Sequence, residues 1–182
     1  MSSGVDQKAR ILEAAARIVG QAGAAHLTMD AVAAESGLSK GGVLYHFPSK
    51  RSLLEGMLQK VLDDVSARTG VYRESSEDEP AAVLRARIRA DSEQSPAERA
   101  MSLALLAAAA EDPELLAPAR QFVGDVFAEI RSAPGDAEFA LVLLLATEGL
   151  RFLDMLDLLP LSAAERQRLH GRLLSLAGEV ES

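Results

Sequence analysis

The segment "AVAAESGLSKGGV", residues 31–43, carries the strongest structural signal in this 182-residue chain. Ala33, Gly37 and Val43 stand at relative positions 0, +4 and +10. When two helices join through a tight turn, the first position must be small so that the helices can cross closely. The second position needs a positive φ, which glycine adopts readily, and the third fills the angle between the helices. The pattern therefore predicts a helix-turn-helix.

Helix signals continue on both sides of this stretch. Thr28 can cap a helix over residues 29–36, Ser39 can cap the next helix, and Ser49 can start a long fourth one. A first helix, capped by Asp6 and ending at Gly23, precedes them. Residues 73–80 form an acidic loop, and further helices are expected at about 81–93, 97–110, 114–132, 137–159 and 163–179.

Composition supports an all-α protein. Apolar residues make up 48% of the chain and aromatic residues only 4%, and the dominant alanine and leucine are good helix formers. The absence of cysteine excludes disulfides and thiolate metal sites. The longest apolar run, residues 139–146, is too short to span a bilayer. We therefore expect a cytoplasmic protein without a membrane partner.

Charge is distributed unevenly along the chain. The net charge is −8, yet residues 1–60 carry +2 and residues 61–182 carry −10. Such asymmetry indicates two parts with different partners, although chance fluctuation explains it about equally well. We expect the two parts to be residues 1–52 and residues 53–182.

The helix that starts after Ser39 has the features of a DNA recognition helix. Gly41 and Gly42 weaken a free helix but let its backbone approach DNA closely. Lys40 lies in the first turn, from which such side chains reach base edges. Gly42 is also explained by relief of a steric clash.

Residues after this helix extend the expected DNA contact. Tyr45 and His46 offer a hydroxyl and a ring N–H, whereas a core aromatic and a packing residue are the alternatives. Lys50 and Arg51 stand at a helix N-terminus, where the macrodipole disfavours cations unless an anion such as a DNA phosphate is present. The predicted DNA-binding residues are Thr28, Ser39, Lys40, Gly41, Gly42, Tyr45, His46 and Lys50.

Residues 6–58 resemble the DNA-binding domain of the tetracycline-repressor (TetR) family. The resemblance is carried by "ILEAAARIVGQAG", "LTMDAVAAESGLSKGGVLYHF" and "PSKRSLL". Residues 39–41, His46 and Lys50 fall on positions that commonly contact DNA in that family. Leu44 occupies the family's usual tyrosine position, and Tyr45 follows it. The resemblance implies a homodimeric regulator, most often a repressor, with a DNA-binding domain at residues 1–52 and a domain at residues 53–182 that binds a small-molecule effector and dimerises. A two-fold dimer presents two identical recognition helices, so we expect double-stranded DNA with an inverted-repeat operator as its partner.

The C-terminal half supports dimerisation independently. Residues 139–146, "FALVLLLA", are apolar on every side of a helix, so such a helix must be covered all round. One side can face its own core and the other a second subunit, although a monomer with a central helix is the alternative. The predicted interface residues are Leu145, Gly149, Leu169, Leu173 and Leu176.

The effector pocket is a weaker prediction, because methionine and phenylalanine line both adaptable cavities and plain cores. Thr147 and Arg151 could hold a polar group of a largely apolar effector, although Glu148 and Arg151 are also spaced for an ordinary i,i+3 pair. The predicted pocket residues are Met57, Met101, Leu105, Phe122, Thr147, Arg151 and Phe152.

Two other classes of protein fit parts of the sequence. An all-helical enzyme with an apolar cleft would need an unrecognised constellation, since His26, His46 and His170 are scattered and no HExxH or GxSxG element occurs. We expect no catalytic residue, no metal and no cofactor. A protein-binding helical adaptor would show no sequence-selective retention of DNA.

Overall fold

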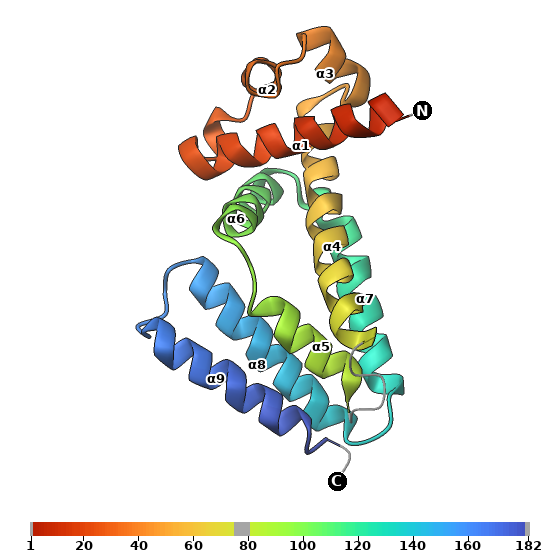
Figure 1. Cartoon of the computed structure of the whole chain (residues 1–182), viewed down its shortest axis with the longest axis vertical. Coiled ribbons are helices and arrows are strands. Elements are labelled where there is room, and N and C mark those ends of the chain that lie inside the picture. Colours follow the sequence, from red (N-terminus) through yellow and green to blue (C-terminus); the bar gives the residue numbers. More distant parts are fainter. Residues whose placement is uncertain (1, 75–80, 181–182) are drawn as a thin grey trace. The chain divides into compact units, whose positions relative to one another are not determined.

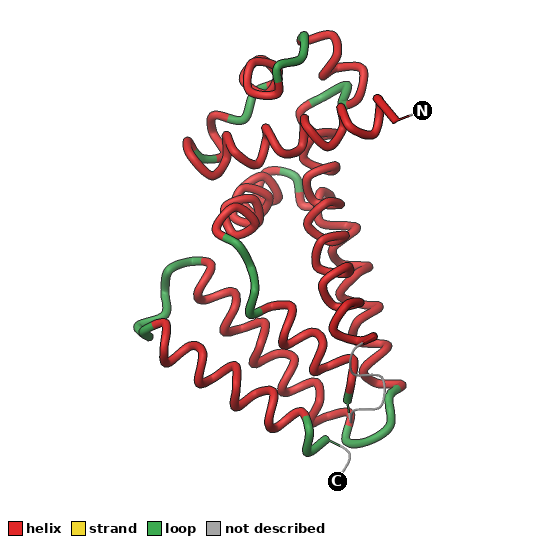
Figure 2. The backbone as a smooth tube through the Cα atoms, viewed as in Figure 1, coloured by secondary structure: helices red, strands yellow, loops and turns green. Residues whose placement is uncertain are grey.

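The computed structural model describes residues 2–74 and 81–180, with side chains from residue 6 onward. Nine α-helices and two short 3-10 helices account for the regular structure of the described residues (Figure 1), which confirms the predicted all-α fold. Figure 2 shows that the helices are joined by short loops and that the described residues contain no strand. The helices are α1 (Ser2–Ala22), α2 (Met29–Ser36), α3 (Lys40–His46), α4 (Lys50–Glu74), α5 (Ala82–Asp91), α6 (Pro96–Glu111), α7 (Ala117–Ser132), α8 (Ala137–Met155) and α9 (Ala163–Ala177).

Four of the predicted helix boundaries need adjustment. The expected helix 137–159 ends early, because α8 stops at Met155 and Asp157 has a positive φ of 56°. α1 begins at Ser2, so Asp6 lies inside the helix and does not cap it. α4 continues to Glu74, into the start of the expected acidic loop, whose residues 75–80 lie outside the described part. The expected helix 114–132 is split, because residues Pro113–Leu116 form a 3-10 turn before α7.

The chain folds into two compact units. One comprises residues 1–62 and 95–120, and the other comprises residues 63–94 and 121–182. α6 thus belongs to the same unit as α1, α2 and α3, while α4 and α7 contribute residues to both units. The compact units differ from the functional division at residues 52 and 53, which stays a prediction.

In the first unit, α2 and α3 pack beside α1 and form the predicted helix-turn-helix. Ala33 is buried, and Val43 is fully buried in the angle between α2 and α3. Gly37 ends α2 with φ 67°, a left-handed conformation that costs glycine little. Thr28 and Ser39 cap the two helices by accepting hydrogen bonds from the backbone N–H groups of Ala31 and Gly42. The three-position pattern is therefore confirmed.

The second unit is built around α5, α8 and α9, which lie side by side (Figure 1). Each of the three helices contributes to an apolar core that includes Leu84, Leu144 and Ala177. α8 starts at the N-cap Asp136, and α9 starts at a capping box formed by Ser162 and Glu165. Over the described ranges, no helix has both the length and the apolar character that crossing a bilayer requires.

Candidate DNA-binding surface and interior ion-pair cluster

The face of α3 that is turned away from the core carries most of the predicted DNA-binding residues. Ser39, Lys40, Gly41 and Tyr45 are exposed, and the Tyr45 side chain reaches 83% exposure. A tyrosine this exposed is not a core aromatic, so its ring and hydroxyl are available to a partner. Its ring meets that of His46 edge-on, with 5.1 Å between the centroids.

Lys40 is held by a neighbouring helix. Its ammonium group lies 3.0 Å from the carboxylate of Asp30, in the first turn of α2. Both side chains are largely exposed, so the pair adds little to stability. It does place a carboxylate beside the cation that we predict to contact bases.

The two glycines of α3 differ in their surroundings. A Cβ added at Gly41 would meet only Ser39 Oγ, at 3.9 Å, which is ordinary contact. A Cβ added at Gly42 would lie 3.3 Å from the same Oγ, which caps the helix through the Gly42 N–H. The folded protein therefore has room for a side chain at position 41 but is tight at position 42.

His46 anchors α3 to α1. Its Nε2 lies 3.1 Å from Gln7 Oε1, and the residue is half-buried. This arrangement matches the packing alternative for His46. It leaves the other ring nitrogen as the atom that could face a partner.

The N-terminus of α4 combines a reciprocal cap with two different cations. Ser49 and Ser52 exchange hydrogen bonds between their hydroxyl groups and backbone N–H groups, each 3.0 Å long. Lys50 is exposed, and no side chain of the described residues pairs with its ammonium group. Arg51 instead donates to Glu55 at 3.0 Å and pairs with Asp112 at the end of α6. Intramolecular pairs thus account for Arg51, whereas Lys50 stays available to an external anion.

The predicted effector residues divide between the two units. Met57, Met101 and Leu105 are buried in the core around α1. In the second unit, Thr147 is fully buried and Phe122 and Arg151 are partly buried. The Phe152 side chain is 43% exposed.

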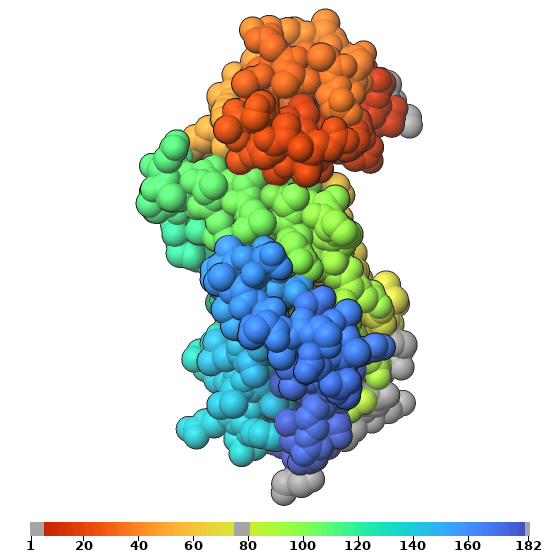
Figure 3. Space-filling model, turned by 90° about the vertical axis from the view of Figure 1, so that its left-hand side faces the viewer, coloured from red at the N-terminus to blue at the C-terminus, as the bar shows by residue number. Residues whose placement is uncertain are grey.

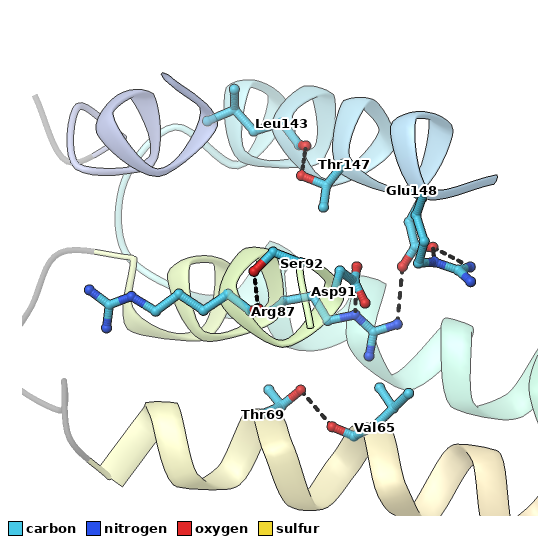
Figure 4. Close-up of polar contacts among 10 residues, drawn as sticks. Val65, Thr69, Arg87, Asp91, Ser92, Leu143, Thr147 and Glu148 are labelled. Carbon is cyan, nitrogen blue, oxygen red and sulfur yellow. Dashed lines mark hydrogen bonds and ion pairs between the residues drawn. The ribbon is translucent and has the colours of Figure 1, made fainter. Parts of the chain in front are cut away.

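A cluster of ion pairs links α5 and α8: Figure 4 shows Glu148 of α8 facing Arg87 and Asp91 of α5, with Thr147 next to Glu148. Arg151 belongs to the same cluster through Glu148. Glu148 accepts from Arg151 at 2.7 Å, as its i,i+3 spacing predicts, and from Arg87 of α5 at 3.0 Å. Arg87 is only 8% exposed, and its guanidinium group stacks over the Phe122 ring, 5.1 Å from the centroid. The fourth member, Asp91, is 7% exposed, and its Oδ2 lies 3.7 Å from Arg87 Nε.

The protein shifts the pKa values of the two acids of the cluster in opposite directions. Burial, together with the charge of Glu148, raises the pKa of Asp91 to about 6, and Arg87, Arg151 and Arg68 offset only part of this effect. Burial also acts on Glu148, but Arg151 and Arg87 outweigh it and hold the pKa of that carboxyl below its usual value. Glu148 is therefore satisfied by its partners, whereas Asp91 is not.

Sequence reasoning missed Arg87 and Asp91, although a signal was present. Leu84, Arg87, Ile88 and Asp91 stand at i, i+3, i+4 and i+7, so they share one face of α5. Because Leu84 and Ile88 must be buried, this spacing indicates that the two charged residues are buried with them.

The outer face of α8 carries an apolar stripe. Its members are separated alternately by three and four residues, which is the spacing of a helix–helix seam. All are exposed in the single chain, and a Cβ at the glycine would meet nothing within 4 Å. We call this set the α8 stripe: Val142, Leu145, Gly149, Phe152 and Leu156.

The predicted interface residues of α9 are partly exposed. Leu169 is 44% exposed, whereas Leu173 and Leu176 also pack against the core of their own unit. Figure 3 shows α9 and the end of α8, in blue, open on the surface of the molecule. By its spacing along α8, Phe152 lies on the same helix face as Leu145 and Gly149.

Family models match both parts of the chain. Residues 11–57 match "Bacterial regulatory proteins, tetR family", and residues 81–178 match "Tetracyclin repressor-like, C-terminal domain". The HTH-type transcriptional regulator BetI of Burkholderia thailandensis is 34% identical over 85 residues, which are 47% of this chain. The match spans 44% of that protein, so it concerns less than half of the relative's length.

Solved structures match over almost the whole chain. A protein from Rhodococcus sp. described as a TetR-family transcriptional regulator is 23% identical, with a TM-score of 0.70 and coverage of 98% of this chain and all of that one. The TetR-family member SCO1917 from Streptomyces coelicolor is 23% identical, with a TM-score of 0.73 and coverage of 92% and 98%. The multidrug binding protein EbrR in complex with ethidium is 25% identical, with a TM-score of 0.65 and coverage of 92% and 98%.

The family models match the helix-turn-helix and the C-terminal helices separately, and the solved structures match both parts together. They identify a regulator and not an enzyme. In the described part of the chain, no three His, Asp or Glu side chains are placed to share a metal ion. The chain belongs to the TetR family of bacterial transcriptional regulators.

Proposed function

We propose that this protein is a homodimeric repressor that binds an inverted-repeat operator and leaves it when a small organic effector enters the second unit. The observation that carries the DNA-binding role is the exposed face of α3, where Lys40, Gly41 and Tyr45 are covered by no element of the described residues. A helix of this kind, preceded by a helix and a tight turn, fits the major groove. Such a protein works in the bacterial cytoplasm, which is the location we propose.

Different residues are proposed to contact the bases and the phosphates of DNA. The first turn of α3, with Lys40, is proposed to read base edges. Thr28, at the start of α2, and Lys50, at the start of α4, are proposed to hold phosphates, since free N–H groups and a cation both favour an anion there. Tyr45 and the free nitrogen of His46 extend the contact to the backbone.

The α8 stripe supports dimerisation. Five exposed positions at alternating spacings of three and four leave an apolar face that another copy can cover, with Gly149 allowing close approach. Leu169 adds to this face from α9. A two-fold dimer presents two identical recognition helices, so the operator should be an inverted repeat.

A small organic effector is supported by the buried polar groups of the second unit and by one relative. The relative EbrR, a multidrug binding protein, is described with ethidium. We propose that the effector is largely apolar and contacts Phe122, Thr147 and Arg151 in the second unit.

Selection of bound duplexes from a random pool tests the operator. The expected product is an inverted repeat whose half-sites are separated by about one helical turn or somewhat more. A single unrepeated motif, or direct repeats, would contradict symmetric docking. A reporter gene placed behind the selected site then tests repression, and its expression should rise when the regulator is removed. A fall in expression would indicate an activator.

A further inference from the structure

A cavity of about 400 Å³ lies in the first unit, apart from the residues proposed to contact the effector. Its walls come from the 3-10 helix Ala24–His26, the first turns of α4 and the C-terminal half of α6. The volume is within the range of about 300–1,000 Å³ that is usual for small-molecule sites. Of the residues proposed to bind DNA, only Lys50 lines this cavity, so the DNA contacts alone do not account for it.

Most of the lining of this cavity is apolar and consists of small side chains. Five alanines and three leucines account for eight of its twelve lining residues, so the cavity suits an apolar body. On the wall formed by α6, Ala107 is exposed and Ala108 is half-buried. An apolar group that enters the cavity would therefore lose contact with water against these alanines, which favours binding.

Four charged residues complete the lining, two from the start of α4 and two from the end of α6. Arg51 of α4 pairs with Asp112, which follows α6, so these two charges satisfy each other. Lys50 and Glu111, their neighbours in the sequence, carry the other two charges. Both are exposed, and among the described residues neither of them pairs with the other or with a third side chain.

An unpaired cation and an unpaired anion in one cavity define the ligand that complements both. A carboxylate alone would be attracted by Lys50 but repelled by Glu111, and an ammonium group alone would meet the reverse. A molecule that carries both groups satisfies the two side chains together, and it leaves the pair between Arg51 and Asp112 intact. Its remaining body should be apolar, because the rest of the lining is apolar.

We propose that this cavity binds a small zwitterion with an apolar body, which is the chemistry of a free apolar amino acid. The ligand carboxylate pairs with Lys50, its ammonium group pairs with Glu111, and its apolar body lies against Ala107 and Ala108. All the lining residues belong to the first unit. Because Lys50 is also proposed to hold a DNA phosphate, ligand and DNA should compete for its ammonium group. That competition rests on the proposed function, whereas the binding itself does not.

Three probes with one aromatic body test the two charges: L-phenylalanine, 3-phenylpropanoate, which lacks the ammonium group, and 2-phenylethylamine, which lacks the carboxylate. Amide chemical shifts of the full chain, followed by NMR at pH 7.5, report both the affinity and the place of binding. We expect phenylalanine to bind about two- to fivefold more tightly than either analogue, since exposed ion pairs contribute factors of about this size. The largest shifts should fall on Ala107 and Ala108.

Removing one charge at a time should remove one preference at a time. In Lys50→Gln, phenylalanine should bind no better than 2-phenylethylamine, because its carboxylate loses its partner. In Glu111→Gln, phenylalanine should bind no better than 3-phenylpropanoate. Both residues are exposed, so each variant should keep the melting temperature of the parent.

Ala107→Phe should fill the cavity and abolish the shifts, and Ala110→Phe is the matched control. Ala110 is an exposed alanine of the same helix that does not line the cavity, so this variant should bind phenylalanine like the parent. Equal affinities of the three probes, shifts confined to the second unit, unchanged preferences in the two charge variants, or parental binding by Ala107→Phe would each overturn the proposal.

Operator binding separates this inference from the proposed function. Band-shift titrations on the selected duplex should show the affinity falling as phenylalanine saturates the cavity, and this effect should disappear in Ala107→Phe. Failure of phenylalanine to bind at millimolar concentration refutes only this inference. Binding in the cavity without any loss of operator affinity refutes instead the assignment of Lys50 to a phosphate, which belongs to the proposed function.

Discussion

Lys40 Nζ lies 3.0 Å from the carboxylate of Asp30, so a cation in the first turn of α3 is tied to an anion in the first turn of α2. Both groups are exposed, and pairs of this kind contribute less than about 1 kcal/mol to stability. The relationship therefore concerns DNA more than folding: it orients Lys40 and places a negative charge where phosphates would approach.

Removing Lys40 and removing Asp30 should have different effects on the preference for the selected site over random DNA. Lys40→Ala should cost about 1–3 kcal/mol on the selected site and far less on random DNA, because a lost base contact affects only the matching sequence. Asp30→Asn should strengthen binding to every duplex, since a repulsive charge is removed. It should also reduce the difference in affinity between selected and random sites, because Lys40 loses the partner that orients it. Band-shift titrations on both duplexes measure this. Equal losses on both duplexes in Lys40→Ala would assign Lys40 to the phosphate backbone.

Substitutions of Lys50 and Arg51 should change the salt dependence of DNA affinity by different amounts. Lys50→Ala should lower the slope of log affinity against log salt by about one unit, because one phosphate contact is lost. Arg51→Ala should lower it less, since Arg51 already pairs with Glu55 and Asp112. Titrations at several salt concentrations provide both slopes. A larger change in Arg51→Ala would mean that DNA breaks the pair with Asp112.

Gly41→Val should weaken DNA binding without destabilising the fold. The structure has room for a Cβ at this position, and glycine is the poorer helix former, so the melting temperature should stay or rise. Binding should nevertheless fall, because the branched side chain holds α3 away from the groove. Gly42→Ala is the contrasting variant, since its Cβ crowds the capping Ser39 Oγ and should lower the melting temperature. Parental operator affinity in Gly41→Val would exclude close backbone approach as the role of this glycine.

The sequence predicted local features best, for physical reasons that individual residues show. Ala33, Gly37 and Val43 define the helix-turn-helix because a close crossing, a positive φ and a buried apolar corner each demand a residue type at a fixed spacing. Caps such as Thr28 and Ser39 are equally local. Signals of this kind need no knowledge of distant contacts.

Contacts between distant segments were harder to predict. Nothing local to α4 shows that Arg51 reaches Asp112, 61 residues away, or that Met57 and Met101 belong to the same core around α1. The predicted residues included Thr147 and Arg151 but not the buried Asp91, because a charged residue is expected to be solvated until its helix face is known to be buried. Pairing across helices depends on the fold, which a single segment does not encode.

Gly149→Arg should disrupt the proposed dimer. In the isolated chain the position is open, with nothing within 4 Å of an added Cβ, so the monomer should fold normally. In a close apolar seam, the arginine would bury an unpaired charge, and sedimentation at micromolar concentration should show monomer. Gly124→Arg, at an equally open glycine of α7, is the control and should stay dimeric. A stable dimer of Gly149→Arg would place the interface away from the α8 stripe.

Asp91 should make folding stability depend on pH between 5 and 7. Its pKa is about 6 in the folded chain and 3.8 as an ordinary carboxyl, so the folded state binds more protons in this range. The free energy of unfolding contributed by Asp91 should therefore fall as pH rises, by about 1 kcal/mol from pH 5 to pH 7. Asp91→Asn cannot titrate, so its stability relative to the parent should increase by that amount over the same range.

Urea unfolding at pH 5, 6 and 7, without any ligand, provides the comparison. Glu148 does not interfere, because its pKa lies below the ordinary value of 4.5 and its contribution is lost only at lower pH. Asp125→Asn, at an exposed acid, should follow the parent in parallel at all three values. If Asp91→Asn also runs parallel to the parent, Asp91 is not the under-compensated carboxylate that its burial and its missing donor indicate.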